Sequence, residues 1–197
     1  GASATLDILT GKVNPSGRLA ETYPISYEQT PAFRYYPSNE KTSEYRESVY
    51  VGYRYYDTSK VRVQYPFGFG LSYSRFSLSA PQIDRSEISI SQLQIGETIT
   101  LRVVLTNIGN YRASETVQLY VRDCVASMMR PLRELKGFQK IELDPGQSQE
   151  LTFFVGYEQL AFYDGGGRYT VEPGKFEVWL GTDALTDNGT SFRVTQH

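Results

Sequence analysis

The sequence of 197 residues has very few of the side chains that most hydrolases use as nucleophile partners or metal ligands. Its single histidine is His197, the last residue, and its single cysteine is Cys124. A Ser-His-Asp or Cys-His centre needs an imidazole packed beside its nucleophile, and a chain end is a poor place for one. The same scarcity excludes a zinc site and an internal disulfide, and we expect no cofactor. Catalysis by this chain would depend on carboxylates and tyrosines.

The charge is nearly balanced, with 20 basic and 22 acidic residues. The densest basic stretch, Arg130, Arg133 and Lys136, is typical of solvated surface, so we expect no nucleic-acid partner. No apolar run approaches the roughly 20 residues of a membrane span, and no signal peptide is present at the start. We therefore expect no membrane association, and the compartment stays open, with cytoplasm slightly favoured over secretion.

Two regions differ in composition, with a boundary near residues 74–80. Residues 1–75 hold five of the nine prolines and 11 of the 16 tyrosines. Residues 2–10 predict a helix with an apolar side, closed by Gly11. A one-sided apolar helix with no local partner indicates that its own domain lies upstream. Residues 49–57 alternate in a way that predicts a strand, although Gly52 weakens it.

Residues 76–197 alternate between apolar and polar side chains, with Gly, Pro, Asn and Asp at the turns. The strongest strand predictions are 99–105, 117–121, 151–155 and 176–180, and further candidates are 76–83, 135–142, 168–172 and 191–195. About seven short strands with one apolar face predict an antiparallel β-sandwich.

Three carboxylates, Glu40, Glu44 and Glu47, lie close together in an aromatic loop. Glycoside hydrolysis needs two carboxyl groups about 5–9.5 Å apart, one of them held protonated by its surroundings. Sequence proximity does not supply that geometry, and Lys41 and Arg46 can neutralise these carboxylates as ordinary ion pairs. We therefore assign no catalytic residue in this chain.

The tyrosines support two hypotheses. Exposed rings could stack on sugars, or they could be buried at a domain junction with their hydroxyls hydrogen-bonded. We favour burial, because both faces of the strand predicted over 49–57 carry tyrosine.

Three smaller features have structural interpretations that we prefer. The sequon at 188–190 is a glycosylation acceptor only in a secretory pathway. We interpret Cys124 as a small buried residue, and the glycines at 165–167 predict a hairpin turn.

Several segments, in one order along the chain, resemble the C-terminal part of family 3 glycoside hydrolases, the β-glucosidase group. They are 11–19 (GKVNPSGRL), 21–24 (ETYP), 44–47 (EYRE), 50–57 (YVGYRYYD), 65–73 (YPFGFGLSY), 106–109 (TNIG), 133–138 (RELKGF) and 143–146 (LDPG). Ser48, where the family often has glycine, and Arg168-Tyr169, which replace a common tryptophan, are departures.

The resemblance implies that residues 1–75 are the end of an α/β sandwich domain with a connecting arm. It implies a fibronectin type III-like (immunoglobulin-like) domain at 76–197. The family's catalytic aspartate and glutamate lie in other segments, so no catalytic residue carries over, and we expect this chain alone to be inactive.

The implied role is a non-catalytic stabilising module of a retaining β-glucosidase, which hydrolyses terminal β-D-glucosyl residues. Its partners would be the TIM-barrel and remaining α/β sandwich domains, with β-glucoside bound only through the parent. The alternative is a carbohydrate-binding module that presents exposed tyrosines to β-glucans.

Overall fold

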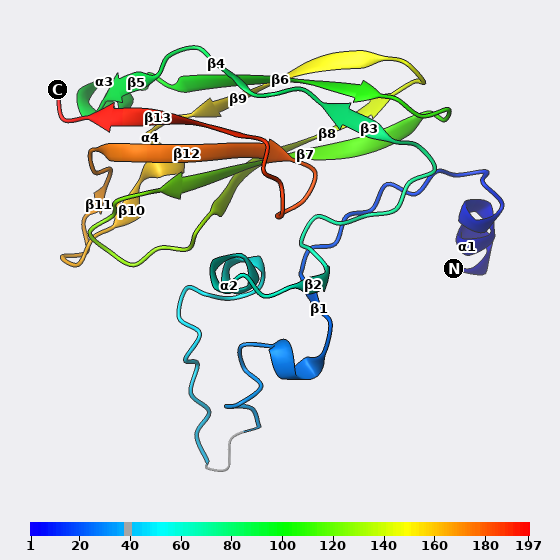
Figure 1. Cartoon of the computed structure of the whole chain (residues 1–197), viewed down its shortest axis with the longest axis horizontal. Coiled ribbons are helices and arrows are strands. Elements are labelled where there is room, and N and C mark those ends of the chain that lie inside the picture. Colours follow the sequence, from blue (N-terminus) through cyan, green and yellow to red (C-terminus); the bar gives the residue numbers. More distant parts are fainter. Residues whose placement is uncertain (38–40) are drawn as a thin grey trace.

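The computed structural model describes residues 1–37 and 41–197. Figure 1 shows a β-sandwich with a more open stretch of chain beneath it. We call residues 1–75 the N-terminal segment and residues 76–197 the sandwich. Helices and strands keep the labels of Figure 1.

One sheet of the sandwich has five strands in the order β5, β13, β12, β7, β8. Their bounds are Glu87–Ser89 for β5, Ala113–Asp123 for β7, Glu134–Leu143 for β8, Gly174–Gly181 for β12 and Gly189–Thr195 for β13. Neighbours in this sheet are antiparallel, except that β5 and β13 run parallel. The predicted antiparallel β-sandwich is confirmed, with one short parallel pair that the sequence did not indicate.

The second sheet is built around β6 (Ile99–Asn107), which pairs with β3 (Phe76–Leu78), β4 (Gln82–Ile83) and β9 (Ser148–Val155). The single strand predicted over 76–83 is therefore two short strands. Pro81 lies directly before β4, and proline has no N–H to continue a ladder of hydrogen bonds, which explains the interruption.

The core lies between the two sheets and consists of the alternating apolar residues of the long strands. Ile99, Leu101, Val103 and Leu105 of β6 are at most 1% exposed, whereas Val104 is 37% exposed on the opposite face. The five-stranded sheet contributes a matching row of buried side chains: Val117, Leu119, Val121, Phe176, Val178 and Leu180. Burying each such side chain contributes about 1.5–3 kcal/mol, so this core stabilises the sandwich without any disulfide.

Short elements close the ends of the sandwich. Helix α3 (Ile90–Gln94) begins at a capping box between Ser89 and Gln92, and helix α4 (Tyr157–Leu160) follows β9. Strands β10 (Phe162–Tyr163) and β11 (Tyr169–Thr170) form a hairpin around the three glycines at 165–167, as predicted.

The N-terminal segment contains α1 (Ala2–Leu9), β1 (Tyr23–Pro24), a 3-10 turn (Tyr27–Gln29), α2 (Tyr53–Ser59) and β2 (Val63–Tyr65), with β1 paired to β2. The predicted first helix is confirmed, and Gly11 follows it with the positive φ of +76° that favours glycine. None of the helices in the described part of the chain is long and apolar enough to cross a membrane.

The strand predicted over 49–57 is wrong, because its second half is helix α2. Gly52 precedes the helix with φ +54°, a conformation that few residues other than glycine adopt. The helix places Tyr53 and Asp57, one turn apart, against the sandwich. Tertiary contacts at this site thus outweigh the β propensity of a tyrosine-rich segment.

Candidate functional site: the seam between the N-terminal segment and the sandwich

The acidic stretch lies in the loop before α2 and has the surroundings of a solvated surface. Glu40 falls outside the described residues. Glu44 is exposed and forms an ion pair with Arg46, whose guanidinium lies 4.7 Å from the centre of the Tyr35 ring. Glu47 is half-buried. The neutralisation of Glu44 by a neighbouring arginine agrees with the ion-pair interpretation of this stretch.

The smaller features have structural partners. Cys124 is half-buried, and burial raises the pKa of its thiol, which disfavours the nucleophilic thiolate. The side-chain amide of Asn188 donates to the carbonyls of Ser79 at 2.9 Å and Leu180 at 3.2 Å. Within the described residues, no cluster of three or more His, Cys, Asp or Glu side chains is placed to hold a metal ion.

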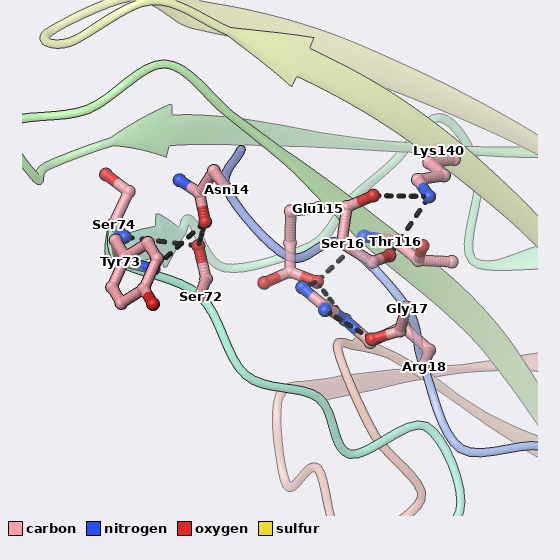
Figure 2. Close-up of polar contacts among 10 residues, drawn as sticks. All are labelled: Asn14, Ser16, Gly17, Arg18, Ser72, Tyr73, Ser74, Glu115, Thr116 and Lys140. Carbon is pink, nitrogen blue, oxygen red and sulfur yellow. Dashed lines mark hydrogen bonds and ion pairs between the residues drawn. The ribbon is translucent and has the colours of Figure 1, made fainter. Parts of the chain in front are cut away.

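The main concentration of polar contacts is instead the seam where the N-terminal segment meets the sandwich (Figure 2). Asn14 connects three stretches of chain there. Its Oδ1 accepts from Ser72 Oγ at 3.1 Å and from the Tyr73 N–H at 3.0 Å, and its Nδ2 donates to the Arg112 carbonyl at 3.2 Å. One amide side chain therefore holds the two ends of the N-terminal segment together and fixes both to the sandwich.

An arginine from the N-terminal segment reaches a buried carboxylate of the sandwich. Arg18 Nε and Nη2 donate to Glu115 Oε1 at 2.8 Å and 2.5 Å, and both side chains are only about a tenth exposed. The same Oε1 accepts the Thr116 N–H at 2.8 Å. Strand β12 pairs with β7 only from Gln118 onward, so Glu115 lies where β7 has no β12 neighbour and Arg18 can approach. Charge and hydrogen bonding both fix this contact.

Helix α2 forms the second anchor of the seam through a buried ion pair. Asp57 Oδ2 lies 2.8 Å from Arg133 Nε, and the two side chains are 12% and 11% exposed. Arg133 also stacks over the Trp179 ring at 4.5 Å and donates to the Thr186 carbonyl at 2.7 Å. Burial raises the pKa of Asp57, and the adjacent Arg133 partly offsets that effect. The guanidinium is therefore fixed by groups from three stretches of chain.

Tyr53 of α2 supplies the apolar part of this anchor. Its ring lies 5.8 Å from that of Tyr120, which is fully buried, and 5.1 Å from that of Phe67. Its hydroxyl accepts the Leu135 N–H at 2.8 Å. Burial raises the pKa of the Tyr120 phenol well above its ordinary range, so that hydroxyl stays protonated and donates to Gln118 Oε1 at 2.7 Å.

Gly68 allows the backbone to approach the sandwich closely. It has φ +89°, and a Cβ at this position would lie 2.7 Å from Gln118 Oε1 and 3.0 Å from the Cα of Asp183. Any larger residue would therefore be strained both in its backbone and by this contact. The neighbouring Phe67 carbonyl accepts the Ala184 N–H at 2.9 Å, which fixes the loop between β12 and β13.

Sequence reasoning did not identify the residues of this seam. Arg18 and Glu115 are 97 positions apart, and neither lies in a motif with a chemical signature. The interpretation of the basic stretch as solvated surface is wrong, because the side chains of Arg130, Arg133 and Lys136 are 11%, 11% and 18% exposed and all three are ion-paired. The strand prediction for Asp57 is wrong as well. Two signals were available. Most seam residues fall in the segments that resemble the family, 11–19, 50–57, 65–73 and 133–138, and the repeated glycine at 65–73 indicates a close approach of backbones.

Away from the seam, the N-terminal segment exposes apolar side chains. Leu71 is 70% exposed and lines a hollow of about 440 Å³ with Leu19, Tyr23, Tyr65 and Phe69. Leu6 and Leu9 of α1 are 59% and 72% exposed. Seven of the eleven tyrosines before residue 75 are exposed in this chain: Tyr23, Tyr27, Tyr35, Tyr36, Tyr45, Tyr65 and Tyr73.

The seam holds the N-terminal segment against the sandwich. The apolar and aromatic side chains that the segment exposes elsewhere are therefore held in a fixed arrangement on the surface of the chain. Exposed apolar patches mark surfaces that contact protein, membrane or ligand, or that promote aggregation.

Comparison with protein families gives two matches. Residues 1–73 match the glycosyl hydrolase family 3 C-terminal domain, and residues 115–184 match the fibronectin type III-like domain.

Curated relatives extend along almost the whole chain. "Thermostable beta-glucosidase B" of Acetivibrio thermocellus is 39% identical over 179 residues, which cover 90% of this chain and 23% of that protein. "Beta-glucosidase BoGH3A" of Bacteroides ovatus is 37% identical and covers 96% of this chain and 25% of that protein. The chain thus spans about a quarter of the length of these relatives.

Solved structures share the same arrangement. The GH3 β-glucosidase of Bifidobacterium adolescentis superposes with a TM-score of 0.87 at 36% identity, covering 98% of this chain and 28% of that one. β-glucosidase 3B of Thermotoga neapolitana, solved with glucose, gives a TM-score of 0.82 at 33% identity, covering 96% and 26%. Both the N-terminal segment and the sandwich are therefore part of one recurring structure.

Proposed function

The chain corresponds to the C-terminal region of the family 3 glycoside hydrolases, and we propose that it is a non-catalytic module that stabilises the catalytic domains of a retaining β-glucosidase. In this proposal residues 1–75 complete the α/β sandwich domain, and residues 76–197 form a separate fibronectin type III-like domain. The observation that carries it is the seam, which fixes an otherwise open segment to a rigid sandwich. The segment's exposed side then offers a preformed surface to the preceding domains.

The names of the relatives support glycoside hydrolysis as the reaction class more strongly than they support any one sugar as the substrate. Most of the related proteins described by name are β-glucosidases, but an "Exo-alpha-(1->6)-L-arabinopyranosidase" of Bifidobacterium breve is 35% identical over 187 residues. A C-terminal region of this kind therefore accompanies more than one glycoside specificity. That is expected if sugar selection depends on domains outside this chain.

The first test is activity of the purified chain on an aryl β-glucoside. We expect no turnover above that of a mock purification, because the carboxylates proposed to do the chemistry lie in other domains. Turnover that co-purifies with the folded chain would contradict the non-catalytic role.

The second test places a charge in the exposed hollow of the longer protein. We expect Leu71→Asp to lower the melting temperature of the longer protein but not that of the 197-residue chain, since only the former has a domain to cover this side chain. Ile95→Asp is the matched control, because Ile95 is similarly exposed (79% against 70%) but lies at the end of α3. Equal effects of Leu71→Asp in both proteins would contradict the docking role.

A further inference from the structure

The sequon Asn188-Gly189-Thr190 lies where the chain leaves the loop after β12 and enters β13. An acceptor for an N-linked glycan is ordinarily a surface loop, in which the asparagine amide can enter the transferase. Here Asn188 is half-buried, and Gly189 pairs with Trp179 in the ladder between β12 and β13, which Thr190 continues. The approach is close, since a Cβ on Gly189 would lie 2.5 Å from Trp179 Cδ1. The sequon is therefore held by the sheet.

The Asn188 amide joins the two sheets of the sandwich. Its Nδ2 donates to the Leu180 carbonyl in β12 at 3.2 Å and to the carbonyl of Ser79, directly after β3, at 2.9 Å. Ser79 is itself bonded to β6, because its N–H donates to the Val104 carbonyl at 3.0 Å and its Oγ accepts the Val104 N–H at 2.9 Å. The Asn188 carbonyl accepts the Leu180 N–H at 3.0 Å. One side-chain nitrogen thus donates to both sheets.

These bonds cross an open edge of the sandwich. Asn188 lines a hollow of about 510 Å³ whose walls come from both sheets. Phe76 and Leu78 of β3 line one side of it, and Leu180 of β12 lines the other. Separation of the two edges would expose these side chains to water, which costs free energy in proportion to the apolar area exposed. The two bonds of the Asn188 amide oppose that separation.

We propose that Asn188 is a modification site that folding closes: the unfolded chain accepts an N-linked glycan there, and the folded chain does not. In the transfer, Nδ2 bonds to C1 of the first sugar of a lipid-linked oligosaccharide diphosphate and gives up one proton. The bond from C1 to the diphosphate oxygen breaks, and the lipid diphosphate leaves with the electron pair. The folded chain holds that nitrogen between two carbonyls. This inference does not depend on the stabilising role proposed above.

A glycan attached before folding would in turn keep this edge from closing. A glycosylated Asn188 retains one N–H, so it can donate to Ser79 or to Leu180 but not to both. The first sugar ring also needs the space beside Nδ2 that one of these two stretches of chain occupies in the folded structure. Glycosylation and the closed edge therefore exclude each other.

The first experiment incubates the folded 197-residue chain with an oligosaccharyltransferase that recognises Asn-X-Thr and with its lipid-linked donor, and follows the product by intact mass and peptide mapping. The unfolded comparison is Leu101→Asp combined with Phe176→Asp, which places two charges in the core, with loss of structure verified by circular dichroism. The folded control is Arg112→Thr, which creates a second sequon at the exposed Asn110 between β6 and β7.

We expect modification of Asn188 to be at least about tenfold greater in the unfolded double variant than in the folded chain, because a closed site reacts only through its open fraction. Arg112→Thr should be modified at Asn110 and not at Asn188. Equal modification of the two asparagines in folded Arg112→Thr would overturn the proposal. So would an unmodified Asn188 in the double variant, or an unmodified Asn110, which would show that folding closes exposed sequons as well.

The second experiment tests the amide bonds themselves by urea denaturation. Asn188→Asp removes both N–H donors while keeping the shape of the side chain, and Asn110→Asp makes the same change at an exposed position. We expect the equilibrium constant for unfolding to rise about ten- to a hundredfold in Asn188→Asp and to stay within about threefold in Asn110→Asp. Equal effects of the two variants would show that the Asn188 amide does not hold the edge closed, and the proposal would fail.

Discussion

Single residues decide how firmly the N-terminal segment is held, and the Arg18–Glu115 pair shows why. Both groups are largely removed from water, and Glu115 Oε1 accepts three N–H groups from Arg18 and Thr116. Removal of one member of a buried pair leaves the other charge without compensation, which costs more than the pair itself contributes. The Arg112–Glu142 pair has a similar distance of 2.6 Å, but both of its side chains are exposed, so loss of one member leaves no buried charge.

We therefore expect Arg18→Ala to lower the free energy of unfolding by about 3 kcal/mol, measured by urea denaturation of the chain. Arg112→Ala is the control, and it should change stability little because water solvates both charges there.

Adding Glu115→Gln to Arg18→Ala should restore part of the lost stability, since the remaining buried group is then neutral. An Arg18→Ala effect as small as that of Arg112→Ala would contradict the role assigned to this pair.

At the scale of elements, helix α2 shows where sequence reasoning was limited. The segment has strong β propensity and alternates over several residues, so a strand was a reasonable prediction. Its helical state depends on Tyr53 and Asp57 meeting Leu135 and Arg133, about 80 residues away in sequence. No local pattern contains that information. The long strands were predictable because an apolar side chain at every second residue marks the face of a strand that packs into the core, as for Leu101 in β6.

The candidate site was less predictable than the fold for the same reason. The seam combines residues that are individually unremarkable, such as Asn14 and Glu115, and its chemistry exists only after the two parts pack. The fibronectin type III-like fold could be predicted because strand alternation and motif order both report it. Sites made by packing leave no comparable pattern in one sequence.

The hairpin of β10 and β11 gives a prediction about pH. Asp164 Oδ1 accepts the Arg168 N–H at 2.9 Å and the Gly166 N–H at 2.8 Å, and these bonds lower the pKa of Asp164 from its ordinary value of 3.8, the Arg168 backbone bond most strongly. The ionised form is thus the one that the folded turn favours. Its contribution is present above the ordinary pKa and is lost as the pH falls through the lowered folded-state value.

An NMR titration of the Asp164 carboxyl group and the Gly166 amide proton should therefore show one shared midpoint below 3.8. Arg168→Ala removes the ion pair at 2.8 Å but keeps the backbone N–H, so the midpoint should stay below the ordinary value. A return to the ordinary value in Arg168→Ala would show that the side-chain charge, rather than the backbone bond, dominates.

At the scale of the whole molecule, the two sides of the N-terminal segment differ. The seam is polar and largely buried, whereas other parts of the segment expose the apolar side chains of α1 and the hollow around Leu71. Helix α1 is fixed mainly through polar contacts such as Tyr73 Oη to the Ile8 carbonyl at 2.7 Å, and its Leu6 and Leu9 remain exposed. An apolar surface of this kind, left uncovered by the described residues, favours association between copies of the chain.

We accordingly expect the 197-residue chain to self-associate with rising concentration, observed as an earlier elution volume and a larger mass by light scattering. Leu9→Lys should shift the chain toward the monomer, because a charge in the contact must be desolvated on association. Ile95→Lys is the control, since Ile95 is as exposed as Leu9 (79% against 72%) but lies on the sandwich. A monomeric elution volume that persists at high concentration, or equal effects of the two variants, would show that this face does not associate by itself. The proposed docking to another domain would then depend on specific complementarity rather than on apolar area alone.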